Sequence, residues 1–153
     1  MKGMTIIVKN ISSFVKVLIF LFGIYIILFG HLTPGGGFAG GVIVASSYVL
    51  LMLAYGREFA EENLSLPTTS RLDCVGALLF AAIALFGLFY GAAGFFWNFI
   101  HQKELWGQPL KLLSAGTIPL SNISIGIKVG ASLFLVILVL SSFRLETSAS
   151  EKE

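Results

Sequence analysis

Charged side chains are scarce in this sequence. Asp, Glu, Lys and Arg make up 12% of its 153 residues, hydrophobic residues make up 56%, and the mean hydropathy is +0.91. Soluble domains carry about 25% charged residues, so this chain has too little charge to cover a globule in water. The composition argues against a soluble enzyme and a disordered protein. The net charge of +2 is also too small for a nucleic-acid-binding face.

Several other features are missing. Cys74 is the single cysteine, so no internal disulfide can form and an oxidised, secreted scaffold is not indicated. The alternating segments of about ten residues that build membrane β-barrels do not occur. No arrangement of residues indicates a metal site, a haem or an activated nucleophile. We therefore expect an integral membrane protein that is not an enzyme and needs no cofactor.

Four apolar segments are long enough to cross a membrane as helices, which takes about 20 residues. We predict a single all-α membrane domain with helices at about 11–30, 34–55, 71–97 and 120–143. The first segment is too long for the core of a signal peptide, and no small-residue cleavage site follows it, so we expect it to be retained. Residues 98–119 are expected to form an external segment and 144–153 a polar tail.

The distribution of lysine and arginine predicts the orientation, because cytoplasmic loops carry an excess of them. Lys103 and Lys111 lie on one side of the predicted helices, and Lys128 lies within the last helix. The other side, with both chain ends and the loop 56–71, holds the remaining seven: Lys2, Lys9, Lys16, Arg57, Arg71, Arg144 and Lys152. We predict a multi-pass protein of the cell membrane with both ends in the cytoplasm.

The turn between the first two predicted helices is rich in glycine and reads GHLTPGGGFAGG over residues 30–41. Thr33 can cap the second helix, and Pro34 suits its first position, where a missing N–H costs nothing. Glycines weaken helices, so we interpret them as places where another backbone packs closely. Contact of the exposed amides with an ion or a water is the alternative. The glycines assigned to the turn and to this packing are Gly35, Gly36, Gly37, Gly40 and Gly41.

The fourth predicted helix has two different faces. Ser124, Lys128 and Ser132 are spaced four residues apart and share one face. Gly126 and Gly130 lie on the opposite face, where they permit close packing. Lys128 is about 13 Å from the proline near the helix start, at a depth where an ammonium costs about 2.5–3.5 kcal/mol. We interpret it as facing a hydrated cavity or a carboxylate of another chain; a lysine that snorkels to the headgroups is the alternative.

Three other polar residues are weaker candidates. His31, at the outer end of the first helix, is interpreted as structural, with proton handling as the alternative. Asp73 follows Ser70 at the spacing of a capping box, which predicts a helix cap rather than a proton relay. Lys16 is expected near the cytoplasmic end of its helix, where it can snorkel. No acidic residue then lies deep in a span. Since proton and sodium paths normally need one, we predict a subunit of a larger complex.

Two motifs together resemble those of the MnhB family, one of the small membrane subunits of the multisubunit Mrp-type Na⁺/H⁺ antiporters. One is the glycine-rich turn, and the other combines GTIPLSNI at 116–123 with GIKVG at 126–130. The resemblance covers nearly the whole chain. It implies that His31, Pro34, the glycines at 35–37 and Lys128 are the polar positions of the family pattern.

The resemblance also implies a role. Neighbouring antiporter-like subunits would carry the main proton relay, and this chain would help form the small-subunit module where Na⁺ or H⁺ crosses. Lys128, His31, Ser124 and Ser132 would line that path. The partners would be other membrane subunits and the lipid bilayer, with no nucleic acid. MnhB-like subunits also occur in membrane-bound respiratory hydrogenases, so a subunit of a redox-driven ion pump is one alternative. A purely structural membrane adaptor is the other.

Overall fold

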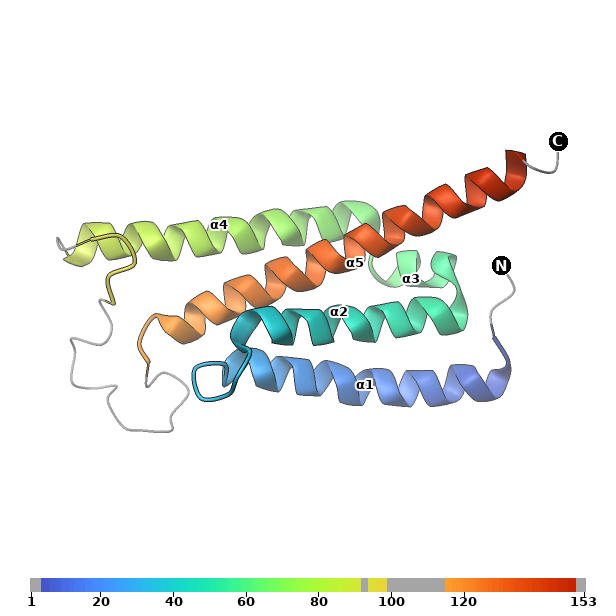
Figure 1. The fold of residues 1–153 in the computed structure, drawn as a ribbon, viewed down its shortest axis with the longest axis horizontal. Coiled ribbons are helices and arrows are strands. Elements are labelled where there is room, and N and C mark those ends of the chain that lie inside the picture. The colour runs from blue at the N-terminus through green and yellow to red at the C-terminus, as the bar shows by residue number, and fades with distance from the viewer. Residues whose placement is uncertain (1–3, 92–93, 99–114, 151–153) are drawn as a thin grey trace.

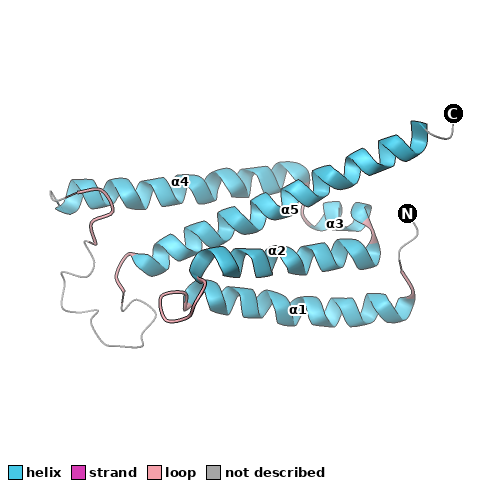
Figure 2. Ribbon diagram, in the orientation of Figure 1, coloured by secondary structure: helices cyan, strands magenta, loops and turns pink. Residues whose placement is uncertain are grey.

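The computed structural model describes residues 4–91, 94–98 and 115–150. Every regular element in these residues is a helix (Figures 1 and 2), which confirms the predicted all-α class. In chain order the helices are α1 (Ile6–Leu28), α2 (Gly36–Tyr55), α3 (Arg57–Asn63), α4 (Leu66–Gly91) and α5 (Ile118–Ser150).

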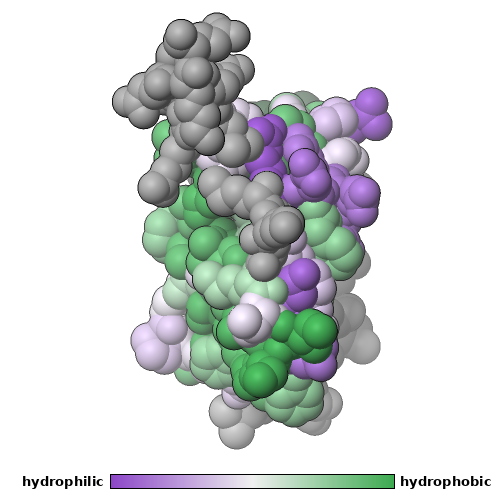
Figure 3. All heavy atoms as spheres, turned by 90° about the vertical axis from the view of Figure 1, so that its right-hand side faces the viewer, coloured by the Kyte–Doolittle hydropathy of each residue, from purple (hydrophilic) through white to green (hydrophobic). Residues whose placement is uncertain are grey.

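Four of these helices are long and apolar enough to span a membrane. The spans are Ile6–Leu28, Gly36–Tyr55, Leu66–Phe89 and Ile118–Ser142. Large hydrophobic side chains are exposed along them, for example Phe14, Phe89 and Leu140. Figure 3 looks onto the end of the bundle where α1 begins and shows hydrophilic residues gathered on part of that end, beside hydrophobic flanks. The protein is therefore a multi-pass membrane protein.

The four spans confirm the predicted four transmembrane helices, but the segment 56–71, which was expected to be a loop, contains the additional short helix α3. Gly56, with a φ of 102°, ends α2 and lets the chain turn directly into α3. Ala60 of α3 is fully buried against Phe134 and Leu138 of α5. A seven-residue helix has no long apolar run, and its order comes from this contact with a distant segment.

The spanning helices lie in the order α1, α2, α5, α4 across the bundle (Figure 1), with α2 between α1 and α5 and with α4 packed on α5. Glycines allow the close approaches. A methyl group on Gly23 of α1 would lie 2.7 Å from Val44 and 3.2 Å from the carbonyl oxygen of Gly40. One on Gly41 would lie 2.9 Å from the carbonyl oxygen of Gly126. These distances are shorter than ordinary van der Waals contact, so the helix backbones meet directly.

The start of α2 differs from the prediction. Gly35 has a φ of 113°, a left-handed conformation that favours glycine, so the helix begins at Gly36 and not at residue 34. Thr33 does not cap α2. Its hydroxyl donates to the carbonyl oxygen of Phe29 at 3.0 Å and so closes the end of α1. Pro34 lies exposed in the turn.

Helix α4 begins at Leu66 rather than residue 71 and ends at Gly91 rather than residue 97. At its start the amide of Thr69 donates to the carbonyl oxygen of Ser65 at 2.9 Å. Pro67 falls in this first turn, where its missing N–H leaves no hydrogen bond unmade. Most of the predicted external segment, residues 99–114, lies outside the described residues. Helix α5 continues to Ser150, so the predicted polar tail is helical to that point.

Candidate functional site

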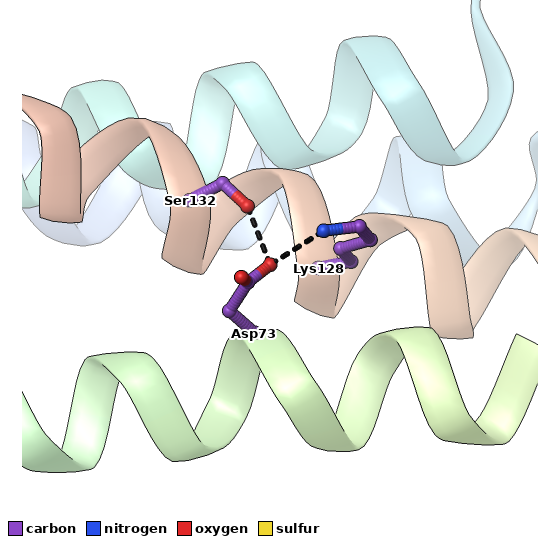
Figure 4. Close-up of polar contacts among 3 residues, drawn as sticks. All are labelled: Asp73, Lys128 and Ser132. Carbon is purple, nitrogen blue, oxygen red and sulfur yellow. Dashed lines mark hydrogen bonds and ion pairs between the residues drawn. The ribbon is translucent and has the colours of Figure 1, made fainter.

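Asp73 of α4 and Lys128 of α5 form an ion pair where these two helices pack (Figure 4). Lys128 Nζ donates to Asp73 Oδ1 at 2.7 Å, and the hydroxyl of Ser132 donates to the same oxygen at 2.5 Å. Lys128 and Ser132 are one helical turn apart, so both reach a single carboxylate. The second carboxylate oxygen, Oδ2, has no hydrogen bond within the described residues and remains available as an acceptor.

The position of Asp73 overturns two predictions. Because α4 begins at Leu66, Asp73 lies seven residues, or about 10 Å, inside the helix. It therefore does not cap the helix, and the expectation that no acidic residue lies deep in a span is wrong. The carboxylate that was expected for Lys128 is present, and it comes from this chain instead of another one.

The pair lies well inside the membrane-spanning part of α5. Lys128 is ten residues from one end of the span Ile118–Ser142 and fourteen from the other, about 15 Å and 21 Å. The hydrocarbon core of a bilayer is about 30 Å thick, so Lys128 is near its middle. Its ammonium bonds to Asp73 at this depth and is not directed to a helix end.

A close backbone contact brings the two partners together. A methyl group on Gly76 of α4 would lie 2.7 Å from the amide nitrogen and 2.9 Å from the Cα of Lys128. No side chain larger than hydrogen fits there, so the two backbones touch. Asp73 is one turn before Gly76 and thereby comes within reach of the Lys128 ammonium. Gly76 was not among the residues predicted for the site; the signal in the sequence is a glycine three residues after an acidic residue in the same span.

The pair is not sealed inside the bundle. The side chain of Lys128 is 46% exposed and that of Asp73 is 28% exposed. This chain therefore presents a cation, a carboxylate and a hydroxyl on its outer surface at mid-membrane depth. Carboxylates and lysines at such depth are the groups that bind or pass protons and cations in membrane proteins.

The structure brings only two of the four predicted path residues together, Lys128 and Ser132. Ser124 shares their helix, but its side chain is buried and donates to the carbonyl oxygen of Leu120 at 3.0 Å. His31 lies in the turn after α1, at the end of the bundle where α5 begins, and it takes no part in the pair.

The glycine-rich turn packs on the start of α5. The amide of Gly37 donates to Asn122 Oδ1 at 3.3 Å, and a methyl group on Gly37 would collide with the Asn122 backbone. Gly36, with a φ of 55°, faces the same asparagine side chain. Farther along, Gly130 approaches the carbonyl oxygen of Gly41. Asn122 was not predicted to have a role beyond its place in the GTIPLSNI motif, yet its side chain holds the turn.

Metal binding finds no support in this part of the molecule. Within residues 4–91, 94–98 and 115–150, no three His, Cys, Asp or Glu side chains come close enough to hold a metal ion. Cys74 is exposed and free. The chemistry of the site is therefore that of the Asp73–Lys128 pair and its hydroxyl neighbour.

Comparison with known proteins gives consistent matches. Residues 7–135 match the family model for a domain related to the MnhB subunit of Na⁺/H⁺ antiporter. The chain is 33% identical over 147 residues to the Staphylococcus aureus protein named "Putative antiporter subunit mnhB2", covering 94% of this chain and 99% of that protein. It is 34% identical over 143 residues to an uncharacterized protein of Methanocaldococcus jannaschii, covering 90% of this chain but 52% of that protein.

One solved structure is also similar. It is the membrane-bound sulfane sulfur reductase (MBS), an archaeal respiratory membrane complex. One of its chains superimposes with a TM-score of 0.72 and 28% identity, over 89% of this chain and 60% of that one. The present chain thus spans about half the length of the Methanocaldococcus relative and three-fifths of the MBS chain.

Proposed function

The chain belongs to the family of domains related to the MnhB subunit of Na⁺/H⁺ antiporters, and from this membership we propose that it is an accessory subunit of a multisubunit, Mrp-type cation/proton antiporter. In that complex it helps form the small-subunit module through which Na⁺ or H⁺ crosses. It catalyses no reaction itself. Its partners are the other membrane subunits, and it resides in the cell membrane.

One observation carries the ion-path part of this proposal: the Asp73–Lys128 pair is exposed at mid-membrane depth. Lipid tails cannot solvate an ammonium or a carboxylate, and charged groups in spans accordingly face a bundle interior or water. Helices α4 and α5 hold the pair on the outside of this chain. The face that carries it is therefore covered by water or by polar groups of a neighbouring subunit.

The geometry suggests how the pair takes part. Lys128 and Ser132 both occupy Oδ1 of Asp73, and Oδ2 is open. A proton or Na⁺ that arrives at Oδ2 competes with the Lys128 ammonium for the same carboxylate charge. Binding of the ion then weakens the ion pair, and release of the ion restores it. Ser132 keeps the carboxylate oriented in both states.

Charge-removing variants test this role in the intact complex. Lys128→Met and Asp73→Asn keep the approximate size of each side chain and remove its charge. We expect the complex to assemble and Na⁺-driven proton exchange in membrane vesicles to fall about tenfold or more, equivalent to about 1.4 kcal/mol. Ser124→Ala is the matched control, because that hydroxyl bonds within its own helix. Normal exchange in both charge variants would favour a purely structural adaptor.

The similarity to the MBS chain supports a second candidate function, a subunit of a redox-driven ion pump. The membrane module would be the same and only the driving reaction would differ. Native purification of the complex distinguishes the two. Antiporter-like subunits alone indicate the antiporter, whereas iron–sulfur or hydrogenase-like subunits indicate a redox-driven complex. Purification of this chain without any other subunit would contradict both.

The proposal includes both chain ends in the cytoplasm, supported by the excess of lysine and arginine on that side. Helix α1 begins and α5 ends at the same end of the bundle (Figure 1). With the exposed Cys74 first replaced by alanine, single cysteines at positions 98–118 should react with an impermeant maleimide from outside. Cysteines at positions 58–68 should not react. The reverse labelling pattern would invert the orientation.

A further inference from the structure

Two lysine–tyrosine contacts lie along the seam between α1 and α2, seven residues apart. Lys9 Nζ is 5.5 Å from the centre of the Tyr55 ring, at the last residue of α2. Lys16 Nζ is 5.0 Å from the centre of the Tyr48 ring. Tyr48 precedes Tyr55 by seven residues, about 10 Å along the helix. The second contact is therefore inside the span, whereas the first is at its end.

Lys16 does not lie where the sequence suggested. It is the eleventh of the 23 residues of α1, so the expectation of a lysine near the helix end is wrong. Its ammonium lies over an aromatic ring inside the span, and the start of α1 is ten residues, or about 15 Å, away.

Within the described residues Lys16 has no anionic partner. The ion pairs found there are Arg57–Glu61 and Lys128–Asp73, and no hydrogen bond from Lys16 Nζ is formed. An ammonium has three N–H donors, and a tyrosine ring satisfies them only through its electron-rich face. A cation–π contact recovers only part of the cost of a lysine in a span. The site therefore lacks an acceptor.

Lys16 and Tyr48 line a shallow groove on the surface of the bundle. The groove has a volume of about 230 Å³, and its other lining residues are Val17, Phe20 and Leu21. Helix α1 is also the least covered of the four spans: 11% of its most apolar stretch is buried, against 39% for α2. This chain thus leaves a cation in an open, mostly apolar groove on its least covered helix.

We propose that this groove docks a transmembrane helix of a neighbouring subunit, and that this helix presents an aspartate or glutamate carboxylate to Lys16. The carboxylate supplies the missing acceptors and neutralises the charge, while the apolar residues around it pack against the helix. The inference rests on the proposed function, because it needs a multisubunit complex. It adds the helix of this chain that makes the contact and the chemistry of the partner.

Co-purification tests the proposal. The complex is isolated through a tag on a different subunit, and the amount of this chain recovered is compared with its amount in the membrane. We expect Lys16→Met to lower recovery about fivefold or more, and Lys16→Arg to keep it near wild type. Lys9→Met is the matched control. It removes the same kind of contact at the helix end and should leave recovery unchanged.

The outcomes separate this inference from the proposed function. If the wild-type chain is recovered with other subunits and Lys16→Met is recovered equally well, Lys16 is a solvated or snorkelling lysine and the inference is wrong. If the wild-type chain is recovered with no other subunit, the proposed function itself fails.

Cross-linking gives a second test that does not depend on how Lys16 variants fold. A photo-reactive phenylalanine analogue replaces Leu21, which lines the groove. In the control it replaces Phe22, which points away from the groove at about 100° per residue. We expect Leu21 to yield an adduct with a membrane segment of another subunit that contains an aspartate or glutamate. Adducts with lipid alone, or with a segment that has no acidic residue, would refute the docking site.

Discussion

The two sides of α5 make contacts of opposite kinds. Toward α2, Gly41 lies directly against the Gly126 carbonyl oxygen and the Gly130 amide nitrogen, so that backbone meets backbone there. Toward α4, Lys128 and Ser132 converge on Asp73, and part of each charged side chain stays exposed. We call the α2–α5 contact at Gly41 the glycine seam, because glycines let the backbones meet there. We call the α4–α5 contact at Asp73 and Lys128 the charged seam. The glycine seam holds α2 and α5 together, whereas the charged seam leaves its charged side chains partly exposed.

The largest expected effect comes from filling the glycine seam. Gly41→Leu places a branched side chain where a single methyl group would already lie 2.9 Å from the Gly126 carbonyl oxygen. We expect α2 and α5 to separate, with a loss of more than about 3 kcal/mol, seen as loss of folded chain in detergent.

Leu53→Ala is the control for the glycine seam. Leu53 is 62% exposed, and an outward-facing side chain can be exchanged with little change in stability. Equal thermal stability of Gly41→Leu and Leu53→Ala would remove the difference between the two sides of α5.

The charged seam should respond differently, because loss of one partner leaves the other charge alone. Asp73→Asn and Lys128→Met are each expected to lower stability, and the double variant to recover part of the loss, with a coupling of about 0.5–3 kcal/mol. Transport should fall in each single variant and stay low in the double variant. Stability is measured by thermal unfolding and transport in vesicles. Recovery of transport in the double variant would show that the pair serves packing only.

A smaller change tests whether the backbone contact sets the ion pair. Gly76→Ala adds one methyl group against the Lys128 backbone and forces α4 away from α5. We expect a loss of about 1–3 kcal/mol and reduced transport, although no charged group is altered. Ala77→Leu is the control, since Ala77 is exposed on the same helix. Unchanged transport in Gly76→Ala would mean that the ion pair tolerates a shift of α4.

The features that the sequence predicts correctly are those with a local signal in the chain. Long apolar runs predict the spans, and the spacing of Lys128 and Ser132 predicts their common face. The start of α4 was missed because Ser70 and Asp73 match a capping box, although Ser65 lies at the true start. With Asp73 at a helix end, the pattern predicts no partner for Lys128 in this chain.

The remaining features depend on contacts between distant segments. The register of α4 against α5 is set where Gly76 meets Lys128, and no local pattern encodes that pairing. The order of α3 depends on Ala60 meeting Phe134. Asn122 acquires its role only because the turn folds back onto α5 and Gly37 donates to its side chain.

The smallest expected effect comes from a single hydroxyl. Ser132→Ala removes one of the two donors to Asp73 Oδ1 and leaves the ammonium of Lys128 in place. Hydrogen bonds between membrane helices average about 0.6 kcal/mol and reach about 1.7 kcal/mol, and the charged acceptor favours the upper part of this range. We expect a stability loss of about 1 kcal/mol, with partial retention of transport. Ser124→Ala should cost less, because its hydroxyl bonds a carbonyl oxygen of its own helix. Thermal unfolding of the two alanine variants side by side measures the difference. An equal cost would show that Ser132 contributes no more to the charged seam than an ordinary serine in a helix.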